Sequence, residues 1–165
     1  VRRGPRLDVE IDAEQGADEA GLLDADNAAP LVTLAVRPGL ASWSDLAGYD
    51  VQPGRYSPYA GVLTAGDPHD LALLRAGRAG VQDEGSQLAA LVMAGASIEG
   101  RDRLWLDMCA GPGGKAALLT GLARERGATL VAAERLPHRA TLVRRSLRGY
   151  SRPWPVVAAD GTAAP

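Results

Sequence analysis

The feature that most constrains this chain is a short apolar run followed by a glycine-rich turn and an amphipathic stretch. Residues 104–106 read Leu-Trp-Leu and lead into Asp107, and the turn that follows contains Gly111, Gly113 and Gly114. Beyond the turn, apolar residues recur at the spacing of a helix: Ala116, Leu118, Leu119 and Leu122. The pattern predicts a buried strand, a tight turn and a helix, which together form the first unit of a nucleotide-binding α/β fold.

Three classes of ligand are candidates for this turn. A phosphate-binding loop is excluded, because Cys109 stands where that motif requires its first glycine and Ala116 follows Lys115 where it requires serine or threonine. A dinucleotide fingerprint, G-x-G-x-x-G/A, does fit Gly111, Gly113 and Ala116, although alone it is a weak pattern. The third class is S-adenosylmethionine.

Two acidic residues favour a nucleoside ligand. Asp107 ends the strand before the glycines, where a carboxylate can steady the turn or meet the ammonium group of a methionine. Residues 129–133 predict a second strand, which leads into Glu134 about 20 residues past the glycines, the usual position of a receiver of ribose hydroxyls. Adenosine and nicotinamide cofactors both bind to such an acid, so Glu134 does not distinguish between the two cofactor classes.

The stretch Asp-Met-Cys-Ala-Gly-Pro-Gly-Gly-Lys at residues 107–115 resembles motif I of the Sun/Fmu (RsmB-type) RNA cytosine-5 methyltransferases. Val-Gln-Asp-Glu-Gly-Ser-Gln at residues 81–87 is similar to the Val-Gln-Asp-x-x-x-Gln segment of that family, and residues 30–38 resemble the short segment before its catalytic domain. The motifs lie in the family's order, and the resemblance covers roughly residues 18–165.

The resemblance implies a partial Rossmann-like methyltransferase domain, the first βαβαβ half, preceded by a small α+β segment. It implies S-adenosyl-L-methionine as cofactor and small-subunit ribosomal RNA as partner. The implied cofactor-binding residues are Cys109, Ala110, Gly111, Pro112, Gly113, Gly114, Lys115, Glu134, Arg139 and Asp160. The family's two cysteines lie beyond the adenine-side aspartate, so we expect a fragment without the C-terminal catalytic half, with no catalytic residue, no methyl transfer and weak or absent cofactor binding.

Two rival functions stay open. An NAD(P)-dependent oxidoreductase rests on Gly111, Gly113, Ala116 and Glu134. A non-catalytic RNA-binding module rests on residues 135–152, which carry six arginines and no acid.

Composition limits the remaining classes. With 46% apolar and 23% charged residues and no apolar run of membrane-spanning length, the sequence predicts a soluble, cytoplasmic protein. The net charge of −2 excludes a polycation. Cys109 is the single cysteine, which excludes an internal disulfide. The sequence contains only two histidines, His69 and His138, so no metal site is expected.

Three regions follow along the chain. Residues 1–29 predict an acidic linker with a short helix near 18–25. In the small α+β segment, residues 30–79, we expect strands at 31–36 and around 56–63, a turn at Pro53-Gly54, and helices at 43–46 and 67–76 capped by Ser42 and Asp67. Its arginines, Arg37, Arg55, Arg75 and Arg78, are either RNA contacts or solvated surface.

The methyltransferase-like region is predicted at residues 80–165. Besides the elements named above, we expect a helix at 84–96 capped by Asp83, a helix from Pro137 and a strand at 154–159. The apolar face of the first of these helices is predicted to consist of Leu88, Leu91 and Val92.

Overall fold

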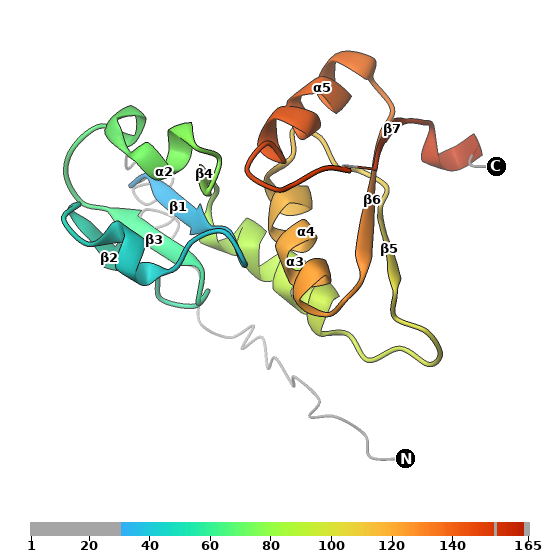
Figure 1. Cartoon of the computed structure of the whole chain (residues 1–165), viewed down its shortest axis with the longest axis horizontal. Coiled ribbons are helices and arrows are strands. Elements are labelled where there is room, and N and C mark those ends of the chain that lie inside the picture. Colours follow the sequence, from blue (N-terminus) through green and yellow to red (C-terminus); the bar gives the residue numbers. More distant parts are fainter. Residues whose placement is uncertain (1–30, 154, 164–165) are drawn as a thin grey trace, which may run out of the picture. The chain divides into compact units, whose positions relative to one another are not determined.

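The computed structural model describes residues 31–153 and 155–163 of the chain. These residues form an antiparallel sheet, a parallel sheet and the helices that pack on them (Figure 1). The predicted α/β architecture, with a parallel sheet after a small α+β segment, is confirmed. The acidic linker and the helix predicted near residues 18–25 lie outside the described residues.

The antiparallel sheet has four short strands in the order β2-β3-β1-β4. The strands are β1 (Thr33–Val36), β2 (Val51–Pro53), β3 (Ala60–Leu63) and β4 (Ala79–Val81). Strand β1 confirms the predicted strand at 31–36. The turn predicted at Pro53-Gly54 is wrong at Pro53, which ends β2 in register with Gly61 of β3. Proline is tolerated there because β2 lies at the edge of the sheet, where a ladder hydrogen bond is not required on its outer side.

Three short helical turns accompany this sheet: η1 (Trp43–Leu46), η2 (Pro68–Asp70) and α2 (Ala72–Arg75). The first confirms the helix predicted after Ser42. The helix predicted at 67–76 is broken at Leu71, whose ψ of 116° is extended and whose side chain is buried. Asp67 caps the first part as predicted, because its carboxylate accepts the backbone N–H of His69 at 2.7 Å. Burial of Leu71 with Leu34 in the core of this sheet outweighs continuation of the helix.

The parallel sheet contains β5 (Leu104–Asp107), β6 (Thr129–Glu134) and β7 (Val156–Ala158) in that order. Helix α4 (Gly114–Glu125) connects the first two strands, α5 (Pro137–Ser146) connects the second two, and η3 (Gly161–Ala163) follows the third. Each connection leads from one strand to the next strand in the same direction across the sheet. Parallel crossovers are normally right-handed, so both helices lie on the same face of the sheet (Figure 1). The strand, turn and helix predicted at the glycines are confirmed.

Strand β5 is not buried as predicted. The side chains of Leu104 and Leu106 are 70% and 56% exposed, while Trp105 between them is half-buried. Alternate side chains of a strand point to opposite faces, and α4 and α5 cover only one face of this sheet. An apolar run of this length cannot reveal which of its faces will be covered.

Helix α3 (Glu84–Gly95) lies between the two sheets and buries a face that differs from the predicted one. Its buried residues are Gln87, Ala90 and Ala94, whereas Val92 is 66% exposed. The two alanines pack in the core that also contains α4, because small side chains allow the helices to approach closely. Gln87 is buried because its amide is fully hydrogen-bonded, which a pattern of apolar residues does not reveal.

Contacts between backbone and side chains join the antiparallel sheet to the parallel half. The guanidinium of Arg37 donates to the carbonyl of Gly77 at 3.0 Å and to that of Ser146. The hydroxyl of Tyr150 donates to the carbonyl of Pro38 at 3.3 Å. A Cβ at Gly149 would lie 2.2 Å from the carbonyl oxygen of Gly77, so glycine is required for this close approach. Among residues 31–153 and 155–163, no helix has the length and apolar character to cross a bilayer.

Candidate ligand-binding site at the glycine turn

The turn leaves β5 at Asp107 and enters α4 at Gly114. Its first half is fixed by two hydrogen bonds: the N–H of Cys109 donates to Oδ1 of Asp107 at 3.1 Å, and the N–H of Ala110 donates to the carbonyl of Ala133 at 3.0 Å. Gly113 occupies the N-cap position of α4 with φ of 120°, which favours glycine. Because glycine has no side chain, the first N–H groups of α4 receive no cap from the N-cap residue.

Asp107 has an unsatisfied oxygen. Its Oδ2 atom is buried and has no hydrogen-bond partner among the described residues. Burial raises the pKa of this carboxyl, against the opposing effects of the Cys109 N–H and the nearby Lys115. A buried acceptor without a partner is costly, and a donor from a bound ligand would relieve the cost. Asp107 therefore fits a ligand that carries an ammonium group.

Glu134 at the end of β6 reaches back to the turn. Its carboxylate accepts the N–H of Leu136 at 3.0 Å and that of Gly111 at 3.1 Å. Hydrogen bonding by Leu136 is the largest cause that lowers the pKa of Glu134, and the nearby Arg139 adds to it. A carboxylate has about four acceptor positions, so two backbone donors leave capacity for ligand hydroxyls.

Arg139 completes this cluster from α5. Its Nη2 donates to the carbonyl of Gly111 at 2.9 Å, and its Nε lies 3.7 Å from Oε2 of Glu134. Gly111 is thus held from both sides, and a Cβ there would meet Oε2 of Glu134 at 2.3 Å. The structure thus brings together Gly111, Glu134 and Arg139, which were all proposed from the sequence. Only glycine fits at position 111, between the two side chains.

Asp160 follows the end of β7 and belongs to the same edge of the sheet. The N–H of Ala159, its neighbour, donates to the carbonyl of Glu134 at 3.2 Å. The carboxylate of Asp160 accepts the N–H and the hydroxyl of Thr162 at 3.0 and 2.7 Å and lies 4.0 Å from Arg135. Its side chain is therefore engaged locally and makes no direct bond to the glycine turn. Asp107 and Glu134, which end β5 and β6, and Asp160, which comes after β7, share one edge, as the carboxyl ends of parallel strands do.

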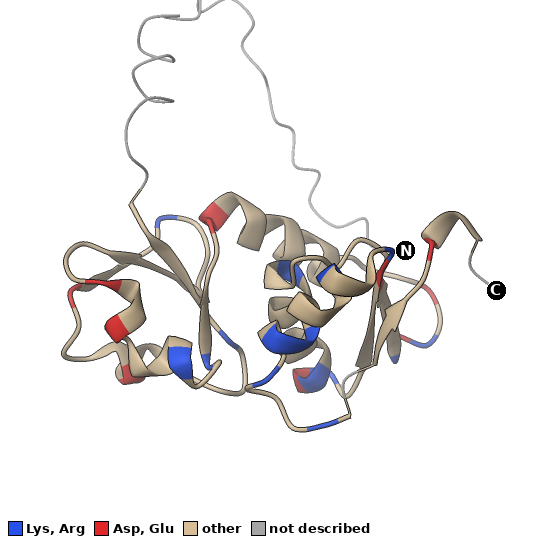
Figure 2. Cartoon of the chain, turned by 90° about the horizontal axis from the view of Figure 1, so that it is seen from above, with Lys and Arg blue, Asp and Glu red and all other residues tan. Residues whose placement is uncertain are grey.

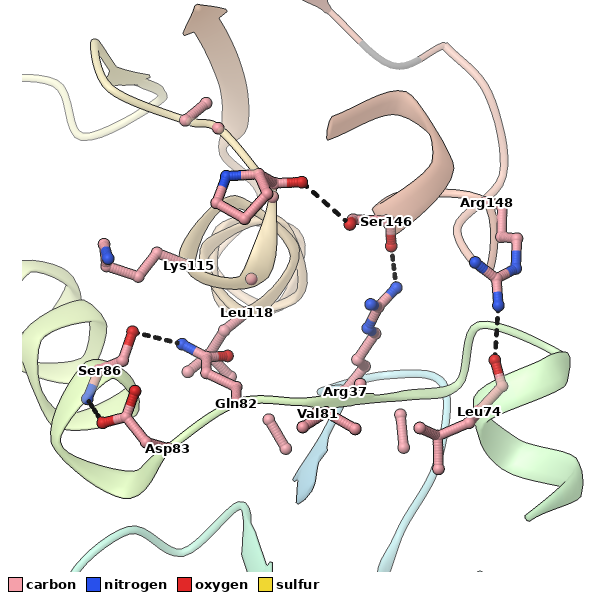
Figure 3. Close-up of a pocket in the computed structure, with 18 residues that line it drawn as sticks. Arg37, Leu74, Val81, Gln82, Asp83, Ser86, Lys115, Leu118, Ser146 and Arg148 are labelled. Carbon is pink, nitrogen blue, oxygen red and sulfur yellow. Dashed lines mark hydrogen bonds between the residues drawn. The ribbon is translucent and has the colours of Figure 1, made fainter. Parts of the chain in front are cut away.

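The opposite side of the turn faces a cavity of about 430 Å³ (Figure 3). Residues 110–115 form one wall of this cavity, and residues from β1 and from around β4 form the other, including Arg37, Gly80 and Gln82. Cys109, Glu134, Arg139 and Asp160 do not line it. Only part of the residue set proposed from the sequence therefore meets in this cavity.

Sequence reasoning missed the role of two residues in the Val-Gln-Asp-x-x-x-Gln segment. The amide of Gln87 donates to the carbonyls of Leu34 and Gln82 at 3.1 and 3.0 Å and accepts the hydroxyl of Ser57 at 2.8 Å. Glu84 accepts backbone N–H groups of residues 55–57 at distances from 2.5 to 3.2 Å. These bonds tie α3 to the antiparallel sheet. The only sequence signal for these contacts was the spacing of the Val-Gln-Asp-x-x-x-Gln motif at residues 81–87.

The predicted cap of α3 is confirmed, and the same segment reaches the glycine turn. Asp83 accepts the N–H of Ser86 at 2.7 Å, and Gln82 donates to the hydroxyl of Ser86 at 3.2 Å. A Cβ at Gly114 would lie 3.5 Å from Gln82, in ordinary contact. The two sequence motifs, at residues 81–87 and 107–115, therefore pack against one another in the fold.

The arginines of the antiparallel sheet differ from each other. Arg37 was expected to be an RNA contact or solvated surface, and the second alternative is wrong because its side chain is buried. Arg78 pairs with Asp45 at 2.8 Å, and Arg75 donates to the carbonyl of His69 at 2.8 Å. Arg55 lies 5.2 Å from the ring of the exposed Tyr56.

Comparison with known sequences supports the resemblance. Residues 97–165 match the model of the family described as 16S rRNA methyltransferase RsmB/F. Two Mycobacterium tuberculosis proteins, "Putative methyltransferase MT1451" of strain CDC 1551 / Oshkosh and "Putative methyltransferase Rv1407" of strain ATCC 25618 / H37Rv, are each 47% identical to this chain over 141 residues. The match covers 85% of this chain and 30% of each relative, so the chain spans about a third of their length.

Comparison with solved structures supports the fold. A crystal structure of PH0851 superposes with a TM-score of 0.75 at 17% identity, covering 92% of this chain and 35% of that one. A methyltransferase homolog from Pyrococcus horikoshii superposes with a TM-score of 0.64 at 20% identity, covering 80% of this chain and 45% of that one. The chain is thus similar to methyltransferases in sequence and has a partial Rossmann-like methyltransferase fold.

Proposed function

We propose that this chain forms the cofactor side of an S-adenosylmethionine-dependent methyltransferase that acts on carbon five of a cytosine in ribosomal RNA, and that it works in the cytoplasm. The observation that carries the proposal is the buried Oδ2 of Asp107, which has no partner in the described part of the chain and lies beside a turn that is also bonded to Glu134. An ammonium group and a ribose on one ligand match these two acids. The match to a family described as 16S rRNA methyltransferase and the two relatives named putative methyltransferases support methyl transfer.

Each residue has an assigned part in holding the cofactor. Residues 109–115 would bind its methionine portion, with Asp107 accepting the ammonium group. Glu134 would accept ribose hydroxyls, while Arg139 positions both Glu134 and the turn through its contacts with Gly111. Asp160 would lie beside the adenine. When bound, the cofactor supplies a methyl group made electrophilic by the adjacent sulfonium.

No residue of the chain is assigned a covalent role. Methylation of carbon five requires a nucleophile to add to the neighbouring ring carbon, and a cysteine thiolate suits that step because it attacks near neutral pH and leaves again. The single cysteine, Cys109, lies in the turn, where its N–H fixes Asp107. We assign Cys109 a structural part in the cofactor turn, and small-subunit ribosomal RNA as the partner.

Ligand-observed NMR tests the cofactor, because saturation transfer detects millimolar binding. We expect S-adenosylhomocysteine to receive saturation from the 165-residue chain and NAD(P)H to receive none. The Glu134→Gln variant should bind S-adenosylhomocysteine about tenfold more weakly, because a charged hydrogen bond to a hydroxyl is lost. Glu125→Gln, at the exposed end of α4, is the matched control. Binding of NAD(P)H alone would instead support the oxidoreductase, and binding of RNA alone would support the non-catalytic module.

The acceptor is tested in cells. Deletion of the gene that encodes this chain should remove one 5-methylcytidine from small-subunit ribosomal RNA, as mapped by mass spectrometry of nuclease fragments. Restoration of the gene should restore the modification. Loss of a different modified nucleoside, with 5-methylcytidine unchanged, would contradict the proposed acceptor while leaving the cofactor assignment intact.

A further inference from the structure

The cavity between the antiparallel sheet and α4 has an excess of positive charge. Its lining includes three cationic side chains, Arg37, Lys115 and Arg148, and a single carboxylate, Asp83 (Figure 3). The carboxylate is already engaged, since it caps α3 by accepting the N–H of Ser86. Basic residues also cluster over the neighbouring helix α5 (Figure 2). The cavity therefore has cationic groups that its own acid does not neutralise.

Arg37 is the most deeply placed of these cations. It is 7% exposed, and its Nη1 donates to two backbone carbonyls. Its Nη2 faces β4, because a Cβ at Gly80 would lie 3.0 Å from that atom. Burial lowers the pKa of Arg37 to about 10, and the nearby Arg148 acts in the same direction. Within the described ranges, neither arginine forms an ion pair with a carboxylate. Arg148 donates to the carbonyls of Arg145, Leu74 and Arg75 at 3.1, 2.6 and 3.3 Å, so its partners are neutral and its charge is not balanced by a carboxylate.

The start of α4 opens into the same cavity. Gly114 and Lys115, its first two residues, line the wall opposite Arg37. Gly113 at the N-cap supplies no side-chain acceptor, so the first N–H groups of this twelve-residue helix are free of an intrahelical partner. Helix N-termini favour anions, and here the helix end and the two arginines line the same cavity.

We propose that this cavity is a phosphate-binding pocket that holds one phosphodiester of a bound RNA strand, on the side of the glycine turn opposite the cofactor. Arginine suits phosphate because its planar group offers paired donors, and phosphate contacts fix the position of a strand without reading its sequence. The identification of RNA as the source of the phosphate rests on the proposed function. The pocket itself rests only on the cavity, its cations and the end of α4.

Inorganic phosphate is the direct probe. In a titration of the 165-residue chain at constant ionic strength, we expect the amide signals of residues 113–116 and the Nε–H signal of Arg37 to shift together. Arg148→Gln should weaken binding about tenfold, as expected for loss of a charged hydrogen bond. Arg145→Gln is the matched control, because it removes the same charge from the last turn of α5, three residues before Arg148, and lies outside the cavity lining. Equal effects of the two variants would overturn the pocket.

A second variant guards against loss of folding. Gly80→Asp places a carboxylate against Nη2 of Arg37, which must shift slightly to admit it, and this should abolish phosphate binding in a chain that thermal denaturation shows to be folded. Retained phosphate binding in this variant would overturn the proposal. A folded chain that no longer binds phosphate would support it.

Two competition arms identify the ligand. A single-stranded RNA oligonucleotide should displace inorganic phosphate, and S-adenosylhomocysteine should not. Displacement by S-adenosylhomocysteine would make the cavity the carboxylate site of the cofactor and overturn the proposal. Phosphate binding without competition by RNA would overturn the assignment to an RNA strand and leave a site for free phosphate. Failure of S-adenosylhomocysteine to bind anywhere would count against the proposed function alone, because the phosphate titration does not depend on it.

Discussion

The carboxylate of Glu134 accepts a hydrogen bond from the backbone N–H of Gly111 at 3.1 Å, which ties the end of β6 to the glycine turn after β5. The two residues are 23 positions apart in sequence. Because Arg139 bonds to the carbonyl of the same glycine, the turn has a fixed conformation before any ligand arrives. Preorganisation of this kind lowers the cost of ordering a binding site.

Gly111→Ala should damage this arrangement. The added Cβ would lie 2.3 Å from Oε2 of Glu134, so the turn or the carboxylate must move. We expect a loss of about 1–3 kcal/mol in the free energy of unfolding, as for other overpacked sites. Urea denaturation followed by circular dichroism measures it. Gly95→Ala, where a Cβ meets nothing within 4 Å, should be neutral or slightly stabilising. Equal destabilisation by both variants would contradict this account.

Gln87→Leu should destabilise the fold although it makes a buried position more apolar. The substitution removes the partner of the Ser57 hydroxyl and of the carbonyls of Leu34 and Gln82. We expect a loss of about 3 kcal/mol, because buried polar groups without partners cost 1–3 kcal/mol each and some will recover water. Gln52→Leu, on the exposed edge strand β2, should change stability by less than about 0.5 kcal/mol. A stable Gln87→Leu variant would show that these bonds contribute little.

Glu84 should contribute a pH-dependent part of the stability. Backbone N–H bonds, led by that of Ser57, hold the pKa of this carboxyl below its usual value. Its contribution is fully present above the unfolded pKa of about 4.3 and is lost as the pH falls through the lower native pKa. In denaturation curves between pH 7 and pH 2, Glu84→Gln should show a shallower loss of stability on acidification than the wild type. The exposed Glu99→Gln is the control, and an unchanged slope in Glu84→Gln would refute the prediction.

Asp107→Asn should separate ligand binding from stability. Burial raises the pKa of Asp107, so the folded state pays to keep this carboxylate charged, and the neutral amide removes that cost. We expect the variant to be as stable as the wild type or more stable. Its affinity for S-adenosylhomocysteine should fall about tenfold, because the acceptor for the ammonium group loses its charge. Thermal denaturation and NMR titration measure the two quantities, and a parallel loss of both would mean that Asp107 only supports the fold.

Several elements of the fold were predictable because they depend on local chemistry. The glycines between Asp107 and α4 identify the turn, since only residues without a Cβ readily adopt the φ of 120° found at Gly113. Asp67 and Asp83 identify helix starts because a short acidic side chain accepts an N–H two or three residues later. The glycine turn and the acids at the strand ends follow from the order of the chain alone.

Only the tertiary structure decided which side chains are buried where burial depends on residues far apart in sequence. Arg37 is buried because the carbonyl of Ser146, 109 residues later, lies beside it, and Gln87 is buried because Leu34 supplies an acceptor 53 residues earlier. The exposure of Leu104 likewise depends on which face the helices cover. Sequence patterns report local torsions and polarity. The burial of a polar group is decided by whether the folded chain brings it a partner.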